Sequence, residues 1–206
     1  MAGVVKVVHS WRCVSDAVVA GLSEPTADPF VRPILVAPGN AQSRSLLQSL
    51  ARRHGIAAGI DTTTPLGLRE RLEEDLLGIK RENDPWQPGP LALRICRIIE
   101  NNSPGFEVVS AHLEASRRQG VPRATWTTAR QAADAICALA RDSHDVLNAW
   151  ADGAAPTSHQ GDTDLAGDPL DPARAWWAPL WRTLLAEPCH VPDPVSRHQL
   201  LVDAIL

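Results

Sequence analysis

The sequence predicts an α/β fold in which a parallel sheet carries a large all-helical insertion. Strand-like apolar segments at 4–8, 34–36 and 56–61 alternate with amphipathic helical segments at 12–23 and 41–54. Strands joined through helices run parallel in one sheet, because the crossover returns the chain to the same edge. Beyond residue 64 the apolar residues recur at helical spacing only, which predicts a second, helical part.

The second strand and the helix after it are the clearest local signal. Ile34, Leu35 and Val36 form a fully apolar run, which is typical of a strand covered on both faces. The helix at 41–54 is amphipathic, with an expected buried stripe of Leu46, Leu47, Leu50 and Ala51. Its outward side chains are expected to be Arg44, Gln48, Arg52 and Arg53. Gly55 is placed to end it in the left-handed conformation.

The helical part is expected to contain segments at 65–78, 88–101, 106–116 and 127–150, the last broken near Asp142-Ser143. In the first of these, leucines recur at positions 66, 68, 72, 76 and 77, and Arg69, Glu73 and Asp75 are predicted to form a charged outer face.

The chain is therefore divided into four predicted parts. Residues 1–64 form the β-α-β-α-β part, and residues 65–150 form a helical subdomain. Residues 151–171 contain almost no large apolar side chains and are predicted to be a flexible loop. Residues 172–206 return to a helical pattern, expected to continue into a missing C-terminal portion. Trp176, Trp177 and Trp181 are predicted to pack in a core there.

Composition excludes several classes of protein. With 20 basic and 24 acidic residues, the net charge is -4, so no global field attracts nucleic acid or a membrane, and any DNA contact must be local. The four cysteines have no metal-ligand spacing; most are expected to be buried free thiols in a reducing cytoplasm. The seven histidines share no face, so neither a metal site nor a catalytic site is predicted. No apolar run is long enough for a signal peptide or a membrane span.

The turn at Pro38-Gly39 has the strand-turn-helix order of a phosphate-binding loop but lacks the residues that bind phosphate. Such a loop requires GxxxxGK[ST], in which the lysine neutralises phosphate charge and the hydroxyl holds magnesium. The segment APGNAQSRS has one glycine and no lysine, and the planar guanidinium of Arg44 is a poor replacement. ATP hydrolysis by this chain is not expected, although an independent nucleotide-binding phosphotransferase or NTPase with a variant loop stays an alternative. The helix N-terminus with Arg44 is a candidate DNA contact.

Collinear short motifs resemble the N-terminal region of the RecC family, the gamma subunit of exonuclease V (the RecBCD helicase-nuclease). They begin with V-x-H-S-x-R at 7–12, DPF at 28–30 and HGIAAGID at 54–61. Further along are RQAAD at 130–134, LxxW at 147–150 and AWWAPLW at 175–181. The resemblance spans essentially the whole chain, which would be about the first fifth of a full family member.

The resemblance implies a superfamily-1 helicase-like fold, RecA-like and derived from a P-loop domain, that has lost its ATPase motifs. It also implies a non-catalytic subunit that binds double- and single-stranded DNA and holds RecB-like and RecD-like motors, which use ATP and Mg²⁺. The work of such a complex is double-strand-break processing and recombinational repair, with scanning for Chi in the enterobacterial type. Family positions contributing to that scanning match Gln42 and Asp134 here.

The sequence departs from the family pattern at Thr64, Glu70, Cys137 and Ser143, where family members carry a leucine, an aromatic, an acidic and a basic residue. A glutamate in place of an aromatic removes a stacking surface and adds repulsion toward phosphate. Recognition of a sequence different from the enterobacterial octamer, or of none, is left open. A helical interaction module without a nucleic-acid role is the third hypothesis.

Overall fold

The computed structural model describes residues 10–22, 31–101, 104–153 and 176–205. They belong to two compact units, Met1–Leu72 and Glu73–Leu206, whose boundary lies inside helix α3 (Pro65–Leu77). The strand predicted at 4–8 and most of the loop predicted at 151–171 lie outside the described residues. The four-part division at residues 64, 150 and 171 stays a prediction.

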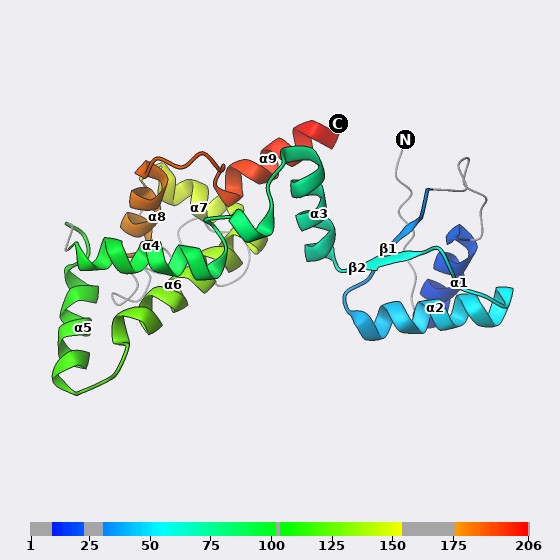
Figure 1. Cartoon of the computed structure of the whole chain (residues 1–206), viewed down its shortest axis with the longest axis horizontal. Coiled ribbons are helices and arrows are strands. Elements are labelled where there is room, and N and C mark those ends of the chain that lie inside the picture. Colours follow the sequence, from blue (N-terminus) through cyan, green and yellow to red (C-terminus); the bar gives the residue numbers. More distant parts are fainter. Residues whose placement is uncertain (1–9, 23–30, 102–103, 154–175, 206) are drawn as a thin grey trace. The chain divides into compact units, whose positions relative to one another are not determined.

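The first unit contains α1 (Trp11–Leu22), β1 (Ile34–Val36), α2 (Asn40–His54), β2 (Asp61–Thr63) and the first turns of α3 (Figure 1). The two strands pair in parallel, with Ile34 opposite Asp61 and Val36 opposite Thr63. Because α2 carries the chain from one strand to the other, the parallel pairing predicted from the strand-helix-strand order is confirmed.

The position predicted for the third strand, 56–61, is wrong. The strand begins at Asp61 and includes the β-branched Thr62 and Thr63. The prediction that β1 is covered on both faces is also wrong for the described residues, since Leu35 is buried while Ile34 and Val36 are each 38% exposed.

Helix α2 confirms the amphipathic prediction. Leu46 and Leu50 are buried together with Ser43, whereas Leu47 and Ala51 are half-buried. The helix ends at Gly55, whose positive φ of 81° lets its N–H donate to the carbonyl oxygen of Ala51.

The second unit is helical throughout its described residues (Figure 1). After the 3₁₀ turn η1 (Arg81–Asn83) come α4 (Pro88–Glu100), α5 (Glu107–Arg118), α6 (Ala124–Asp142), α7 (His144–Ala151), α8 (Trp177–Ala186) and α9 (Pro194–Ile205). The predicted break near Asp142-Ser143 separates α6 from α7 and is confirmed.

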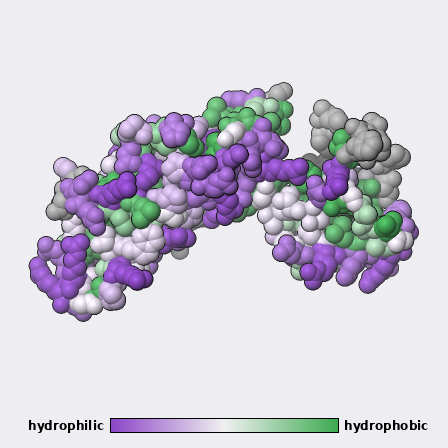
Figure 2. Space-filling model, viewed as in Figure 1, coloured by the Kyte–Doolittle hydropathy of each residue, from purple (hydrophilic) through white to green (hydrophobic). Residues whose placement is uncertain are grey.

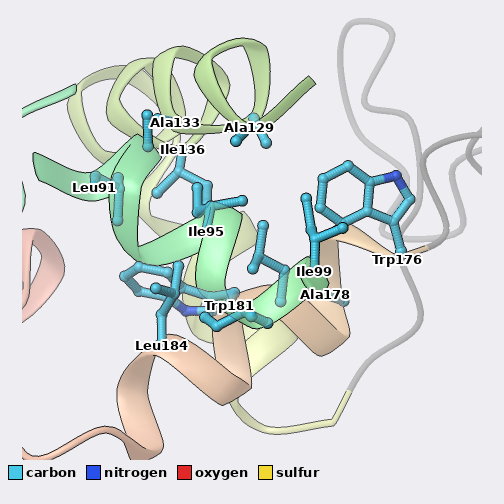
Figure 3. Close-up of a cluster of buried hydrophobic side chains, with 14 of the residues drawn as sticks. Leu91, Ile95, Ile99, Ala129, Ala133, Ile136, Trp176, Ala178, Trp181 and Leu184 are labelled. Carbon is cyan, nitrogen blue, oxygen red and sulfur yellow. The ribbon is translucent and has the colours of Figure 1, made fainter. Parts of the chain in front are cut away.

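The core of this unit lies where α4, α6 and α8 meet (Figure 3). Helix α6 contributes a stripe of small residues, with Ala129 and Ala133 fully buried, which lets α4 approach closely. Trp176 and Trp181 are buried as predicted, and Trp177 is half-buried.

Trp86 belongs to the core and also contacts residues at its edge. Its indole N–H donates to the carbonyl oxygen of Val191 at 3.2 Å, and its ring meets Trp181 edge to face with centroids 5.6 Å apart. The guanidinium of Arg94 lies 4.5 Å from the Trp86 ring centroid and also pairs with Glu187 at 2.8 Å.

The prediction that three of the four cysteines are buried is wrong for at least one of them, because Cys13 and Cys189 are both exposed. Cys96 and Cys137 are half-buried, and the Cys137 thiol donates to the Trp86 carbonyl oxygen at 3.5 Å. Burial raises the pKa of Cys137 to about 11.

A buried ionic cluster connects three segments of the second unit. The guanidinium of Arg197 in α9 binds both carboxylate oxygens of Asp84, and Nη1 lies 2.8 Å from Oδ2. The same nitrogen lies 3.5 Å from Glu73 in α3, and Nε donates to the carbonyl oxygen of Pro192. Glu73 was predicted on a charged outer face but is buried, because Arg197 neutralises it there.

The Asp84 carboxylate is stabilised in its ionised form. Burial alone would raise its pKa, but hydrogen bonds from Arg197 and from the Trp86 backbone N–H outweigh burial and lower it. The side chain of Gln87 donates a further hydrogen bond at 3.1 Å.

We expect Arg197→Met to destabilise the second unit by about 3–5 kcal/mol, because the substitution leaves Asp84 buried without its charge partner. Hydrogen exchange of α4 and α9 amides in the purified protein measures the loss as a lower opening free energy. The control is Arg118→Met, which removes an exposed i,i+4 pair with Glu114 and should change stability by less than about 0.5 kcal/mol. Equal effects of the two substitutions would contradict the role given to Arg197.

We also expect stability to fall in acid through Asp84. Since its folded pKa is lowered, the stabilisation is fully present above the ordinary value of 3.8 and is lost as the pH falls through the folded value. An acid titration followed by tryptophan fluorescence measures this loss, because Trp86 and Trp181 are buried beside the cluster. Asp84→Asn should show a smaller decrease in stability below pH 3.8 than the unsubstituted protein.

Candidate nucleic-acid interface

The turn between β1 and α2 is short and has an extended backbone. The Ala37 N–H donates to the Thr63 carbonyl oxygen at 3.0 Å and so belongs to the sheet. Pro38 has no N–H, and Gly39 stands at the N-cap of α2 with φ -170° and ψ 172°. No side chain caps the helix, although the Ser43 hydroxyl donates back to the Gly39 carbonyl oxygen.

This geometry does not form a phosphate cradle. A phosphate-binding loop aims several successive backbone N–H groups into one concavity. Here one of the three turn residues uses its N–H in the sheet, and the next has none. With no lysine in the segment, the turn presents only Gly39 and the first turn of α2 to an anion.

Gln42 and Arg44 are both exposed on the first turns of α2, two residues apart and therefore on different sides of the helix. A Cβ at Gly39 would lie 3.1 Å from the Gln42 side-chain oxygen, so this amide lies directly against the turn. Arg44 and Arg52 are eight residues apart, which places them near one face of the helix. In the described part of the chain, no ion pair is formed by Arg44, Arg52 or Arg53, so their charges remain available to an anionic partner.

Other arginines of the first unit are partly neutralised. Arg32 and Arg71 both lie near the Asp61 carboxylate, at 3.8 and 3.6 Å. These pairs are exposed and weak, but they distinguish the two arginines from those of α2.

The two units carry opposite charge. Residues 1–72 contain eight basic and five acidic residues, a net charge of +3, whereas residues 73–206 contain twelve basic and nineteen acidic residues, a net charge of -7. The small overall charge therefore conceals a basic unit, and α2 with its three unpaired arginines lies in it.

Asp134 lies in the other unit. It is exposed on α6, where both carboxylate oxygens accept hydrogen bonds from Arg130 Nε at 3.1 Å. Gln42 and Arg44 thus share helix α2 of the first unit, and Asp134 lies in a separate compact unit.

Thr64 has a structural role that sequence reasoning missed. Its hydroxyl accepts a hydrogen bond from the Gly67 N–H at 3.1 Å and so caps α3, while Pro65 occupies the first helical position. The Thr-Pro pair before a leucine-rich run was the signal that would have found it.

The histidines were predicted to share no face, but His144 and His198 are stacked with ring centroids 4.5 Å apart. Searching the described residues finds no group of three or more potential metal-binding His, Cys, Asp or Glu side chains. Among the same residues, no helix is long and apolar enough to cross a membrane.

These features define a domain with a parallel strand pair, a basic helix and a helical unit, in which the strand-to-helix turn lacks a phosphate cradle. The profile of the family described as "RecC, N-terminal domain" matches residues 8–205. The chain belongs to this family, which confirms the resemblance seen in its motifs.

Two curated relatives cover most of the chain. It is 29% identical over 200 residues to the RecBCD enzyme subunit RecC of Mycobacterium tuberculosis (strain CDC 1551 / Oshkosh) and 26% identical over 187 residues to that of Mycolicibacterium smegmatis. Each alignment covers 86% of this chain but only 16% and 15% of the relatives. The chain thus spans about a sixth of the length of the relatives it matches.

We expect Thr64→Val to destabilise α3 by about 1 kcal/mol, because valine keeps the β-branched shape but loses the capping oxygen. Faster hydrogen exchange at the first amides of α3 would measure the loss. Thr64→Ser keeps the hydroxyl and serves as the control. Similar exchange in the two variants would show that the cap contributes nothing.

Proposed function

We propose that this chain is the N-terminal part of a non-catalytic DNA-binding and scaffolding subunit of a RecBCD-type helicase-nuclease. The observation that carries the proposal is the family match over residues 8–205, together with relatives named RecBCD enzyme subunit RecC. In this role the chain guides unwound strands during double-strand-break processing and recombinational repair. Scanning of a strand for a Chi-like sequence belongs to the same proposal, with Gln42 and Asp134 as contacts.

The first unit is, on this proposal, part of an inactivated superfamily-1 helicase-like domain. Support comes from the parallel pairing of β1 and β2 and from the β1-α2 turn, which stands where a motor would hold phosphate. A turn with one proline, one sheet-bonded N–H and no lysine has lost the parts that bind nucleotide.

ATP and Mg²⁺ are used by RecB-like and RecD-like partners in this proposal, and the assembly works in the cytoplasm. The same turn geometry argues against the alternative of an independent NTPase, since Arg44 has no surrounding N–H cradle to complete. The unpaired arginines of α2 argue against a helical module without a nucleic-acid role.

DNA contact is assigned to the exposed face of α2. Each phosphate neutralised by an arginine releases condensed counterions, so binding through Arg44 and Arg52 must weaken as salt rises. The net charge of +3 on the first unit favours this surface over the second unit, where phosphate meets a net charge of -7.

We expect Arg44→Gln with Arg52→Gln to weaken forked-duplex binding by the full-length subunit assembled with its partners. Two lost phosphate contacts predict roughly fivefold to tenfold weaker binding per arginine at 0.1 M salt and a salt slope lower by about 0.9 for each. Fluorescence anisotropy across a salt series measures both quantities. Arg97→Gln, an exposed arginine of α4 in the acidic unit, is the matched control and should change neither.

Two outcomes would contradict the proposed function. One is forked-duplex binding by the assembled complex that is insensitive to the α2 substitutions and to salt. The other is ATP turnover by the purified full-length subunit alone that survives removal of contaminating motors and is abolished by Arg44→Ala.

A further inference from the structure

The turn between α5 and α6 is a basic surface on an acidic unit. From Ala115 through Ala133 the chain has four arginines and no carboxylate, although the unit as a whole has a net charge of -7. We define the α5-α6 tip as Arg117, Arg118, Val121, Arg123 and Trp126, all of which are exposed. Figure 1 shows this turn at the lower left, where Figure 2 shows mainly hydrophilic surface with a small apolar area.

A tryptophan ring is also exposed at the tip. Trp126 is 39% exposed and Val121 is 47% exposed, whereas Trp86, Trp150, Trp176 and Trp181 in the same unit are at most 4% exposed. Trp126 thus leaves part of a large indole in contact with water on the first turn of α6, three residues from the exposed Arg123.

The arginines of the tip differ in how far they are neutralised. Arg118 pairs with Glu114 at 3.0 Å in an exposed i,i+4 bridge, and Arg117 reaches the Thr125 hydroxyl at 3.4 Å. Glu100 and Glu114 line a shallow hollow with Arg117, so part of its charge is offset. Arg123 forms no ion pair with another described residue, and its charge is the most available of the three.

The backbone at Arg123 is also unusual. With φ 57° and ψ 26°, it is the one non-glycine residue with positive φ in the described part of the chain. A glycine would adopt this conformation without strain, so an arginine here keeps a charged side chain at a conformational cost.

A surface with exposed arginines and an exposed tryptophan fits a single strand better than a duplex. In a duplex the bases are stacked on each other, and only the phosphates would meet the tip. A single strand offers phosphates to Arg118 and Arg123 and an unstacked base to Trp126 at the same time. Protein interfaces also use tryptophan and arginine, but a segment with four arginines and no carboxylate beside an exposed tryptophan, on an otherwise acidic unit, favours a polyanion.

We propose that the α5-α6 tip is a binding site for single-stranded nucleic acid, separate from α2, at which a base stacks on Trp126 and phosphates pair with Arg118 and Arg123. The proposal rests on the strand-handling function proposed above and adds a second contact for the unwound strand.

The test uses the full-length subunit assembled with its partners and a fluorescein-labelled oligothymidylate. Trp126→Ala should weaken binding about tenfold through the lost stacking, and Trp126→Phe should restore most of it. Arg123→Gly removes the charge without backbone strain and should lower the salt slope by about 0.7, whereas Arg123→Lys should retain the slope. Arg141→Gln, at the opposite end of α6, is the charge-matched control and should bind as the unsubstituted complex does.

The outcomes separate this proposal from the preceding one. Unchanged oligothymidylate affinity in Trp126→Ala and Arg123→Gly, with normal binding by the unsubstituted complex, would overturn the tip and leave the proposed function standing. Loss of a partner subunit from these variants in gel filtration would show that the tip is a protein interface and would also overturn it. An unsubstituted complex that binds neither oligothymidylate nor forked duplex would overturn the proposed function itself.

Discussion

The second unit depends on the buried pairing of Arg197 with Asp84. Two charges are removed from water there, and only the bidentate geometry, together with the hydrogen bonds from the Trp86 backbone and Gln87, compensates for the lost hydration. The pair connects the last helix to the segment that precedes α4, and through Glu73 it also holds α3. Because Asp84 orders the backbone at Trp86, the same pair positions the indole that packs against Trp181.

Local structure was predictable where periodicity determines it. The leucine stripe of α2, its glycine end, the alanine stripe of α6 and the break before α7 all follow from side chains within one or two turns of each other. The burial of Glu73 was not predictable in this way, because its partner Arg197 is 124 residues away in the sequence. Helical spacing places a glutamate on a polar face and gives no information about a distant arginine that neutralises it.

The candidate interface, too, was predictable from the sequence only in part. The exposure of Arg44 and Arg52 follows from the amphipathic pattern, and the missing lysine indicates that the turn is not a nucleotide site. Only the structure shows that the turn has no cradle of N–H groups, since this depends on the hydrogen bond from Ala37 to Thr63. The overall net charge does not show that the first unit is basic, because the boundary between Leu72 and Glu73 is known only from the structure. The roles implied for Gln42 and Asp134 remain predictions.

The different environments of the thiols have a practical consequence. With its pKa near 11, Cys137 is about one part in ten thousand thiolate at neutral pH, and Cys96 also has a raised pKa through burial, so both react slowly with alkylating reagents. Cys13 and Cys189 are exposed, and each belongs to a different compact unit. The natural sequence therefore already provides one accessible attachment point per unit for a donor and an acceptor dye, with which energy transfer would report the distance between the two units.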